Sequence, residues 1–328
     1  ETHLFAPRDT PRVLPGIDWS GNLIGLTNYI GTRGGGFLAT TDENGKVTRT
    51  FLDAGENPPA GVVVHYRLAE TPSDPLTLTF KKANGDEIRS FTSRQPDDPA
   101  IAKELRAPAD PGWNRFLWDM RYTPVTKIEG TDPPAEKPID GPIVAPGDFT
   151  VTLKAGDTEL TQPFKIVKPS NLPATQEDLD AQEDLLLRIY HELDRTTNAI
   201  NRMRDLRAQL DGWSKRTKDR KGASDIAKDA ENLRDKVLEI EKTILIPDTR
   251  SGWADSLNQG ARLLEKLSGL TPAVALGDYR PTDAAEQAFT DITNRLNTQI
   301  TAFDTLVADE LPKFNELVQK SGLAAVVG

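Results

Sequence analysis

With 328 residues the chain is long enough for about two domains, and its 37% hydrophobic residues suffice for ordinary cores. Its 50 acidic and 40 basic side chains give a formal net charge of -10, which disfavours nucleic acid and anionic lipid as partners because their phosphates repel an acidic chain. The absence of cysteine excludes disulfides and thiolate sites, and no stretch approaches the roughly 18 apolar residues of a transmembrane helix.

The first part of the chain, residues 1–54, has the least regular pattern. The chain begins at Glu1, without a methionine or the features of a signal peptide, so we expect either a removed leader or a longer parent protein. An apolar run at 37–41 is followed by a turn at 42–45 and a second run at 47–52, which predicts a β-hairpin. We therefore assign residues 1–54 to an N-terminal extension that carries this hairpin.

Residues 55–168 carry the alternation of apolar and polar side chains that is typical of half-buried strands. The dipeptides Asn84-Gly85 and Gly156-Asp157 each lie between two such runs and predict hairpin turns. Two sheets that face each other bury the apolar faces best, so the expected fold is an Ig-like antiparallel β-sandwich of roughly six or seven strands. The alternating runs are 62–68, 76–81, 86–91, 116–122, 149–154 and 158–167.

Aromatic residues are concentrated around the run at 116–122. We expect Trp113, Phe116 and Trp118 to lie in the core, where each buried ring contributes roughly 2–3 kcal/mol. Asp119 and Arg121 lie on the opposite face and are expected to pair with charges on neighbouring strands.

Two long proline-rich loops, at 107–112 and 127–146, flank this aromatic strand. We expect both loops to add surface to the β-sandwich.

Proline and glycine separate the chain into two halves. Of 24 prolines 19 lie in residues 1–172, and of 24 glycines 16 lie there. Dense turn-formers are typical of strands and loops, whereas sparse turn-formers are typical of long helices. The proline-bracketed linker at 168–173 therefore predicts the boundary between a β segment and a helical segment.

The helical segment, residues 174–328, begins with a capping signal. Thr175, followed by Asp178 three residues later, predicts the start of a helix of about 35 residues. Apolar residues then recur at heptad-like spacing, which predicts packing against partner helices. This stripe consists of Leu179, Leu186, Ile189, Leu193, Ile200, Met203 and Leu210.

Three further helices are predicted after a basic loop at 214–223. A return helix carries apolar residues from Ile226 to Ile244, a shorter helix runs from about 256 to 267, and Pro281-Thr282 opens a final long helix. Short connections favour neighbouring helices of opposite direction, so we expect an antiparallel α-helical bundle.

Carboxylates in loops are the candidates for catalysis and for metal binding. A glycoside hydrolase needs two carboxyl groups roughly 5 or 6.5–9.5 Å apart, and calcium needs a set of oxygen ligands. With 50 acidic residues, loop carboxylates arise by chance, and their spacing matches no EF-hand ligand set. We therefore assign no catalytic residue and no metal ligand. The candidates considered are Asp97, Asp98 and Asp110 for catalysis, and Asp132, Asp140 and Asp148 for calcium.

The glycine run at 31–36 is the candidate for a phosphate cradle. No helix pattern follows it, so we expect a loop and assign no cofactor. His65 and His191 lie off the apolar faces of their elements, and we expect both to be solvated.

The basic loop at 215–221 either recognises an acidic partner or lipid headgroups, or is simply the solvated tip of a helix pair, which we favour. Trp213 and Trp253 lie just past predicted helix ends. We expect them to pack in a core, with an exposed aromatic binding patch as the alternative.

Four stretches of the chain carry a family resemblance: residues 3–8, 55–68, 112–122 and 141–153. In this order they resemble the C-terminal region of large secreted bacterial proteins with N-terminal BNR-repeat, sortilin-like β-propellers, which are often labelled glycosyl hydrolases. The resemblance covers nearly the whole chain, because that family also has a helical segment after its last strand. It implies a secreted, periplasmic or cell-surface location.

The propeller itself is not expected in this chain. Its Asp-box repeat, S/T-x-D-x-G-x-T-W/F, is absent, and the most similar string, at 40–51, has a different spacing. Catalytic residues that the family owes to its propeller are therefore not carried over.

The expected function is that of a non-catalytic structural or interaction segment. Its partner would be a β-propeller domain or chain, or another envelope protein, bound through the long loops or one helix face. Two alternatives are an accessory part of a secreted, sialidase-like glycoside hydrolase, and a carbohydrate-binding β-sandwich. The carbohydrate alternative requires an exposed aromatic platform, whereas the clearest aromatic residues are expected to face inward.

Overall fold

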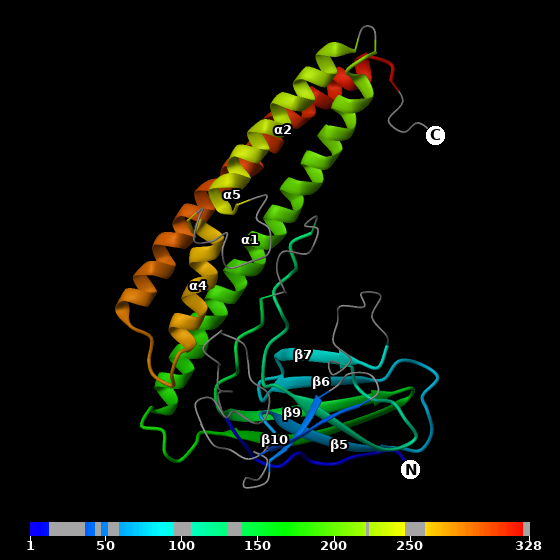
Figure 1. Cartoon of the computed structure of the whole chain (residues 1–328), viewed down its shortest axis with the longest axis vertical. Helices are drawn as coiled ribbons and strands as arrows, with labels where there is room; N and C mark the ends of the chain where they lie inside the picture. The colour runs from blue at the N-terminus through cyan, green and yellow to red at the C-terminus, as the bar shows by residue number, and fades with distance from the viewer. Residues whose placement is uncertain are drawn as a thin grey trace. The chain divides into compact units, whose positions relative to one another are not determined.

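A computed structural model describes the chain in eight ranges: 1–12, 37–42, 47–51, 59–94, 106–129, 139–220, 223–246 and 260–323. The contacts between residues divide the chain into two compact units, which we call the β unit and the helical unit (Figure 1). The β unit consists of Glu1–Arg121 and Ile143–Pro173, and the helical unit of Tyr122–Pro142 and Ala174–Gly328. The chain therefore has a β + α fold.

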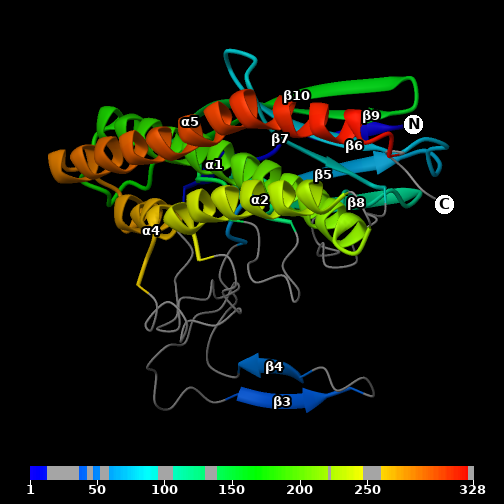
Figure 2. The ribbon, with the colours of Figure 1, turned by 90° about the horizontal axis from the view of Figure 1, so that it is seen from above.

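Within the described ranges, the strands of the β unit form three sheets. The order is β1-β5-β8 in a three-stranded sheet and β2-β10-β9-β6-β7 in a five-stranded sheet, while β3 and β4 pair only with each other (Figure 2). All pairs are antiparallel except β2 with β10. The strands are β1 (His3–Leu4), β2 (Thr10–Pro11), β3 (Phe37–Thr41), β4 (Val47–Phe51), β5 (Val62–Leu68), β6 (Thr77–Lys82), β7 (Glu87–Thr92), β8 (Gly112–Trp118), β9 (Gly147–Ala155) and β10 (Thr158–Val167).

The predicted alternation and turns are confirmed at several places. In β5 the residues at even positions are buried and His65 and Arg67 are exposed, as the period of two requires. Gly85 and Gly156, with φ of 94° and 57°, form the turns between β6 and β7 and between β9 and β10. These positive φ angles suit glycine because it lacks a Cβ. The hairpin predicted at 37–52 is also present as β3 and β4.

A cluster of aromatic rings joins the three-stranded and five-stranded sheets. Phe80 of β6 stacks on Trp118 of β8, with ring centroids 4.3 Å apart. Phe91 of β7 lies against Phe116 of β8, at 4.7 Å. The inner faces of the two sheets therefore share one core. The N-terminal residues contribute to both sheets through β1 and β2.

Two predictions around β8 are wrong. Trp113 is not in the core, because its side chain is 70% exposed and lies opposite in parity to the buried Phe116 and Trp118. The strand also ends at Trp118 rather than at residue 122. The cause is Met120, which is buried but has a φ of 60°, a left-handed conformation that interrupts the strand.

The loop predicted at 127–146 does not belong to the β unit over its whole length, because residues up to Pro142 group with the helices. We call Tyr122–Glu129 the strap. The Thr126 backbone N–H and hydroxyl both donate to Asp194, at 2.9 and 2.7 Å. Asn201 accepts from the Glu129 N–H at 2.8 Å and donates to the Lys127 carbonyl at 2.9 Å. The strap therefore lies along α1, where side chains of the helix form hydrogen bonds with the strap's backbone N–H and carbonyl groups.

Strong local signals define the helices of the helical unit. Thr175 caps α1, and Asp178 closes the predicted capping box from the third position. All residues of the predicted heptad-like stripe on α1 are buried, and α1 contacts α2, α4 and α5. Thr282 caps α5 as predicted. The helices are α1 (Gln176–Thr217), α2 (Ser224–Ile244), α4 (Leu263–Ala275) and α5 (Asp283–Lys320).

The predicted helix lengths need correction. The first helix has 42 residues and includes the buried Ser214, so the connection to α2 is shorter than the predicted loop at 214–223. The third helix does not end near residue 267 but continues through Pro272 to Ala275. Pro272 has no N–H to donate to the Ser268 carbonyl, so the helix continues to Ala275 without that backbone hydrogen bond.

None of the helices in the described ranges is both long and apolar enough to cross a bilayer.

Candidate functional site

The outer face of the three-stranded sheet carries exposed aromatic and basic side chains. Strand pairing places His3 opposite Arg67 and Arg67 opposite Trp113, and it places His65 opposite Arg115. The alternate residues of the same strands point to the core. We call this surface the aromatic face; it consists of His3, Phe5, His65, Arg67, Trp113 and Arg115, all of which are exposed.

Two rings form the apolar centre of the aromatic face. The Phe5 and Trp113 rings are stacked, with centroids 5.1 Å apart and an interplanar angle of 22°. His3 meets Phe5 edge-on at 4.4 Å. Phe5 is 36% and Trp113 70% exposed, so a large apolar area remains in contact with water.

The charge of the aromatic face is opposite to that of the whole chain. Its six residues include two arginines and two histidines and no carboxylate, whereas the chain has a net charge of -10. The Arg67 guanidinium donates to the Glu1 carbonyl at 2.8 Å, which holds it in place. The face therefore attracts an acidic group next to an apolar one.

Buried polar groups support the aromatic face from below. The Tyr66 hydroxyl donates to the Pro108 carbonyl, and burial, together with the nearby Asp110 carboxylate, raises the pKa of Tyr66 well above its usual value. The Asn114 amide donates to the Asp110 carbonyl at 2.8 Å and accepts from the Asp110 N–H at 3.2 Å. These bonds fix the turn that leads into Trp113.

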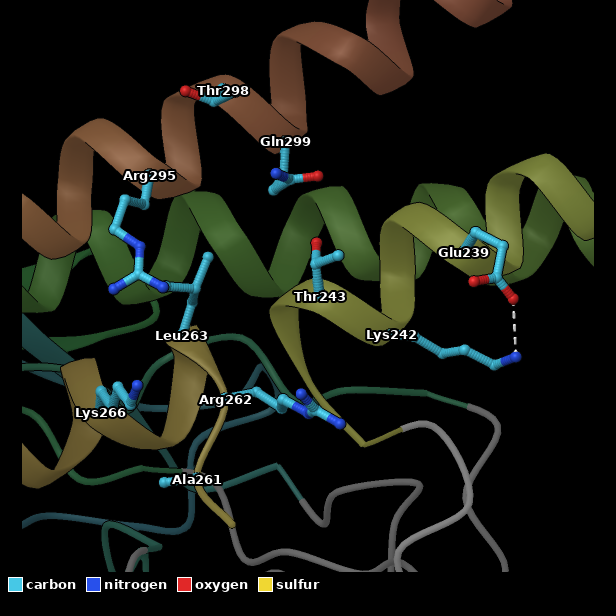
Figure 3. Close-up of a pocket in the computed structure, with 10 residues that line it drawn as sticks. All are labelled: Glu239, Lys242, Thr243, Ala261, Arg262, Leu263, Lys266, Arg295, Thr298 and Gln299. Carbon is cyan, nitrogen blue, oxygen red and sulfur yellow. Dashed lines mark hydrogen bonds and ion pairs between the residues drawn. The ribbon is translucent and has the colours of Figure 1, made fainter. Parts of the chain in front are cut away.

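A second candidate is a groove in the helical unit, with a volume of about 600 Å³. It lies where α2, α4 and α5 meet, and Figure 3 shows side chains from all three helices around it. Four lining residues are basic and one is acidic. We call it the basic groove; it is lined by Glu239, Lys242, Thr243, Ala261, Arg262, Leu263, Lys266, Arg295, Thr298 and Gln299.

The positive charge of the basic groove is only partly neutralised. Lys242 pairs with Glu239 at 2.8 Å, at one end of the groove. Arg295 meets Asp291 only at 3.6 Å. Across the described part of the chain, no ion pair is formed by Arg262 or Lys266.

Most carboxylates predicted as candidates do not form a site. Asp110 and Asp140 are exposed, and Asp148 pairs with Lys165 at 3.1 Å. The described ranges contain no group of three or more histidine and carboxylate side chains that could hold a metal ion. Asp97, Asp98, Asp132 and the glycine run at 31–36 lie outside the described residues.

The predictions for the other candidates have mixed outcomes. His65 and His191 are exposed, as predicted. Trp213 packs edge-on against Phe314 of α5, at 6.3 Å, which confirms core packing for this residue. Trp253 lies outside the described residues.

The basic loop is largely the end of α1 and the turn that follows it. Lys215 and Arg216 belong to the last turn of α1, and Arg216 stacks over the Trp213 ring at 3.7 Å. Lys218 and Arg220 are exposed in the turn, and Lys221 lies outside the described residues. The described residues at the C-terminal end of α1 therefore form a charged tip that is exposed to solvent.

Sequence reasoning missed both surfaces. The exposure of Trp113 could have been predicted, because side chains alternate between the two faces of a strand and Trp113 lies an odd number of residues before the buried Phe116. The basic groove had no such signal, since its arginines lie on separate helices and meet only through packing.

No protein-family model matches the chain, and a search of curated proteins finds no match either. Function is therefore inferred from the two surfaces.

Proposed function

We propose that this chain is a non-catalytic interaction segment whose aromatic face binds a protein partner. The observation that carries this proposal is the 70% exposed Trp113, stacked on Phe5 and flanked by Arg67 and Arg115. Tryptophan and arginine are the residues that most often dominate binding energy in protein interfaces. Exposure of this stacked ring pair to water is unfavourable because the rings are apolar. A partner that covers the two rings removes their apolar area from water and thereby gains binding free energy.

The finer architecture is also part of the proposal. We propose an Ig-like β-sandwich, supported by the ring contacts between the inner faces of the two larger sheets, such as Phe80 on Trp118. For the helical unit we propose an antiparallel α-helical bundle, supported by the buried stripe on α1 and its contacts with three other helices.

The proposed partner is a β-propeller domain or chain of a secreted or cell-envelope bacterial protein. This choice rests on the sequence resemblance at 3–8, 55–68, 112–122 and 141–153. The chemistry of the aromatic face adds that the partner surface should offer acidic side chains beside an apolar pocket.

The test measures binding of the chain to the β-propeller encoded in the same reading frame or operon. We expect a 1:1 complex, detected by analytical ultracentrifugation and calorimetry. Trp113→Ala should weaken it by roughly 30-fold or more, which corresponds to a central aromatic residue of an interface.

Tyr279→Ala is the matched control. Tyr279 is an aromatic residue of the helical unit, 44% exposed and outside the aromatic face. Its substitution should leave the affinity unchanged. Absence of a complex, or equal weakening by the two variants, would contradict the proposal.

Carbohydrate binding is the second candidate, favoured by the free face of the Trp113 ring. A sugar ring can stack on that face, and Arg67 or Arg115 can pair with a sugar carboxylate. A glycan array with neutral and acidic sugars separates the two functions. Signals that disappear in Trp113→Ala would support the carbohydrate function, and silence of the array would remove it.

A further inference from the structure

The basic groove is a separate surface from the aromatic face, because it lies within the helical unit. Its lining comes from α2, α4 and α5, and these helices contact one another, so the groove belongs to one packed body. The buried Leu263 begins α4 on the groove wall, and its packing fixes the backbone next to Arg262.

We propose that the basic groove binds the phosphoryl group of an anionic ligand. Arg262 of the α4 start and Arg295 of α5 supply two guanidinium groups from different helices, and Lys266 adds an ammonium group one turn further along α4. Arginine presents planar pairs of N–H donors that match phosphate oxygens, and lysine adds a point charge. The Gln299 amide supplies a neutral hydrogen-bond donor on α5, whereas the Thr298 hydroxyl already donates to the Asn294 carbonyl at 3.0 Å.

The charge balance of the groove favours an anion. Four basic residues line it against Glu239 alone, and Glu239 is already paired with Lys242. Arg262 and Lys266 line the groove from the start of α4, and neither forms an ion pair in the described part of the chain. An anion in the groove would neutralise these charges, and the 3.6 Å contact of Arg295 with Asp291 is weak enough to be exchanged.

The size of the groove indicates which anions fit. A volume of about 600 Å³ is in the range of sites for small organic ligands and is much larger than a single phosphate ion needs. The ligand is therefore a phosphorylated compound, which is either a soluble phosphate ester or a lipid headgroup.

The experiment uses the full chain with two phosphoryl probes. Calorimetry with pyrophosphate tests a soluble ligand, and flotation with phosphatidic acid vesicles, against phosphatidylcholine vesicles, tests a headgroup. We expect saturable binding of at least one probe. Arg262→Gln should weaken that binding by about tenfold, and the double variant with Lys266→Gln should reduce it below detection.

The control variant carries Lys228→Gln and Lys313→Gln, which remove the same charge from exposed positions of α2 and α5 outside the groove. This control should bind as the unchanged chain does. The proposal is overturned if neither probe binds, if the groove variant retains binding, or if the control loses as much. Circular dichroism of each variant verifies that the helices are intact.

Discussion

Glu241 is the residue whose environment has the clearest energetic consequence. Its carboxylate is fully buried and accepts from Arg204, at 2.9 Å, and from Arg207. Two guanidinium groups on α1 thus share one carboxylate on α2. A buried set of paired charges contributes little net stability, because the cost of removing the charges from water offsets their attraction. Removal of one charge is nevertheless costly, because the remaining charges stay buried without a counter-charge.

We therefore expect Glu241→Gln to lower the free energy of unfolding by about 3 kcal/mol, since the two arginines lose their counter-charge. Urea unfolding followed by circular dichroism at 222 nm measures this change. Glu239→Gln is the control on the same helix. Glu239 pairs with Lys242 at the surface, so its loss should cost less than about 0.5 kcal/mol. Similar losses in the two variants would contradict the role of the buried group.

At the scale of elements, the strap depends on a close backbone approach at Gly141. A Cβ at this position would lie 2.3 Å from the Tyr122 carbonyl oxygen and 2.7 Å from that of Thr123. These are backbone atoms, so the neighbouring chain would have to move to accept a side chain. Val125, three residues after Tyr122, is part of the helical core, and it would be disturbed by that movement.

We expect Gly141→Ala to destabilise the helical unit by roughly 1–3 kcal/mol, as overpacking does. Faster hydrogen exchange at the Thr126 and Glu129 amides, which donate to α1, should accompany this loss. Gly147→Ala is the matched control, because its Cβ would meet only the Phe149 ring at 3.7 Å, an ordinary contact. Unchanged exchange at both amides in Gly141→Ala would contradict the prediction.

The same elements explain how far the sequence predicts the fold. Alternation and heptad spacing are local, so the strands at β5 and β9 and the stripe on α1 could be predicted from neighbouring residues. Trp113 departs from the prediction because its position in β8 has the opposite parity to the buried Phe116 and Trp118, whereas the size of its ring alone favours burial. The left-handed φ of Met120 has no local signal, since glycine, asparagine and aspartate are the usual residues there.

The candidate site was less predictable than the fold. The aromatic face requires the pairing of β1 with β5, which joins residues more than 60 positions apart in the chain. The basic groove requires the side-by-side packing of α2, α4 and α5. Neither pairing is specified by periodicity, because periodicity identifies a buried face but not its partner.

For the whole molecule, the important feature is that neither unit is a continuous segment. The chain passes from one unit to the other after Arg121, after Pro142 and after Pro173. Residues 174–328 therefore lack the segment 122–142, whose apolar contacts with the helical core involve Val125 and Ile128 of the strap and also Ile139.

We expect a fragment of residues 174–328 to be less stable than the helical unit of the full chain, by roughly 2–4 kcal/mol, because apolar surface on α1 is uncovered. Helix unfolding in urea measures this difference. A peptide of residues 122–142 added in trans should restore part of the stability, whereas a peptide of scrambled sequence should not. A fragment with the full stability would show that the strap contributes no net stabilisation.

The order of synthesis gives the strap a further consequence. Asp194 and Asn201 follow their strap partners by 68 and 72 positions, so the strap leaves the ribosome well before the helix that receives it. At about 5–20 residues per second, the nascent strap waits roughly 3–14 seconds with Val125 uncovered. During this interval Val125 is exposed to water, and the speed of translation from residue 130 to Asn201 sets how long that interval lasts.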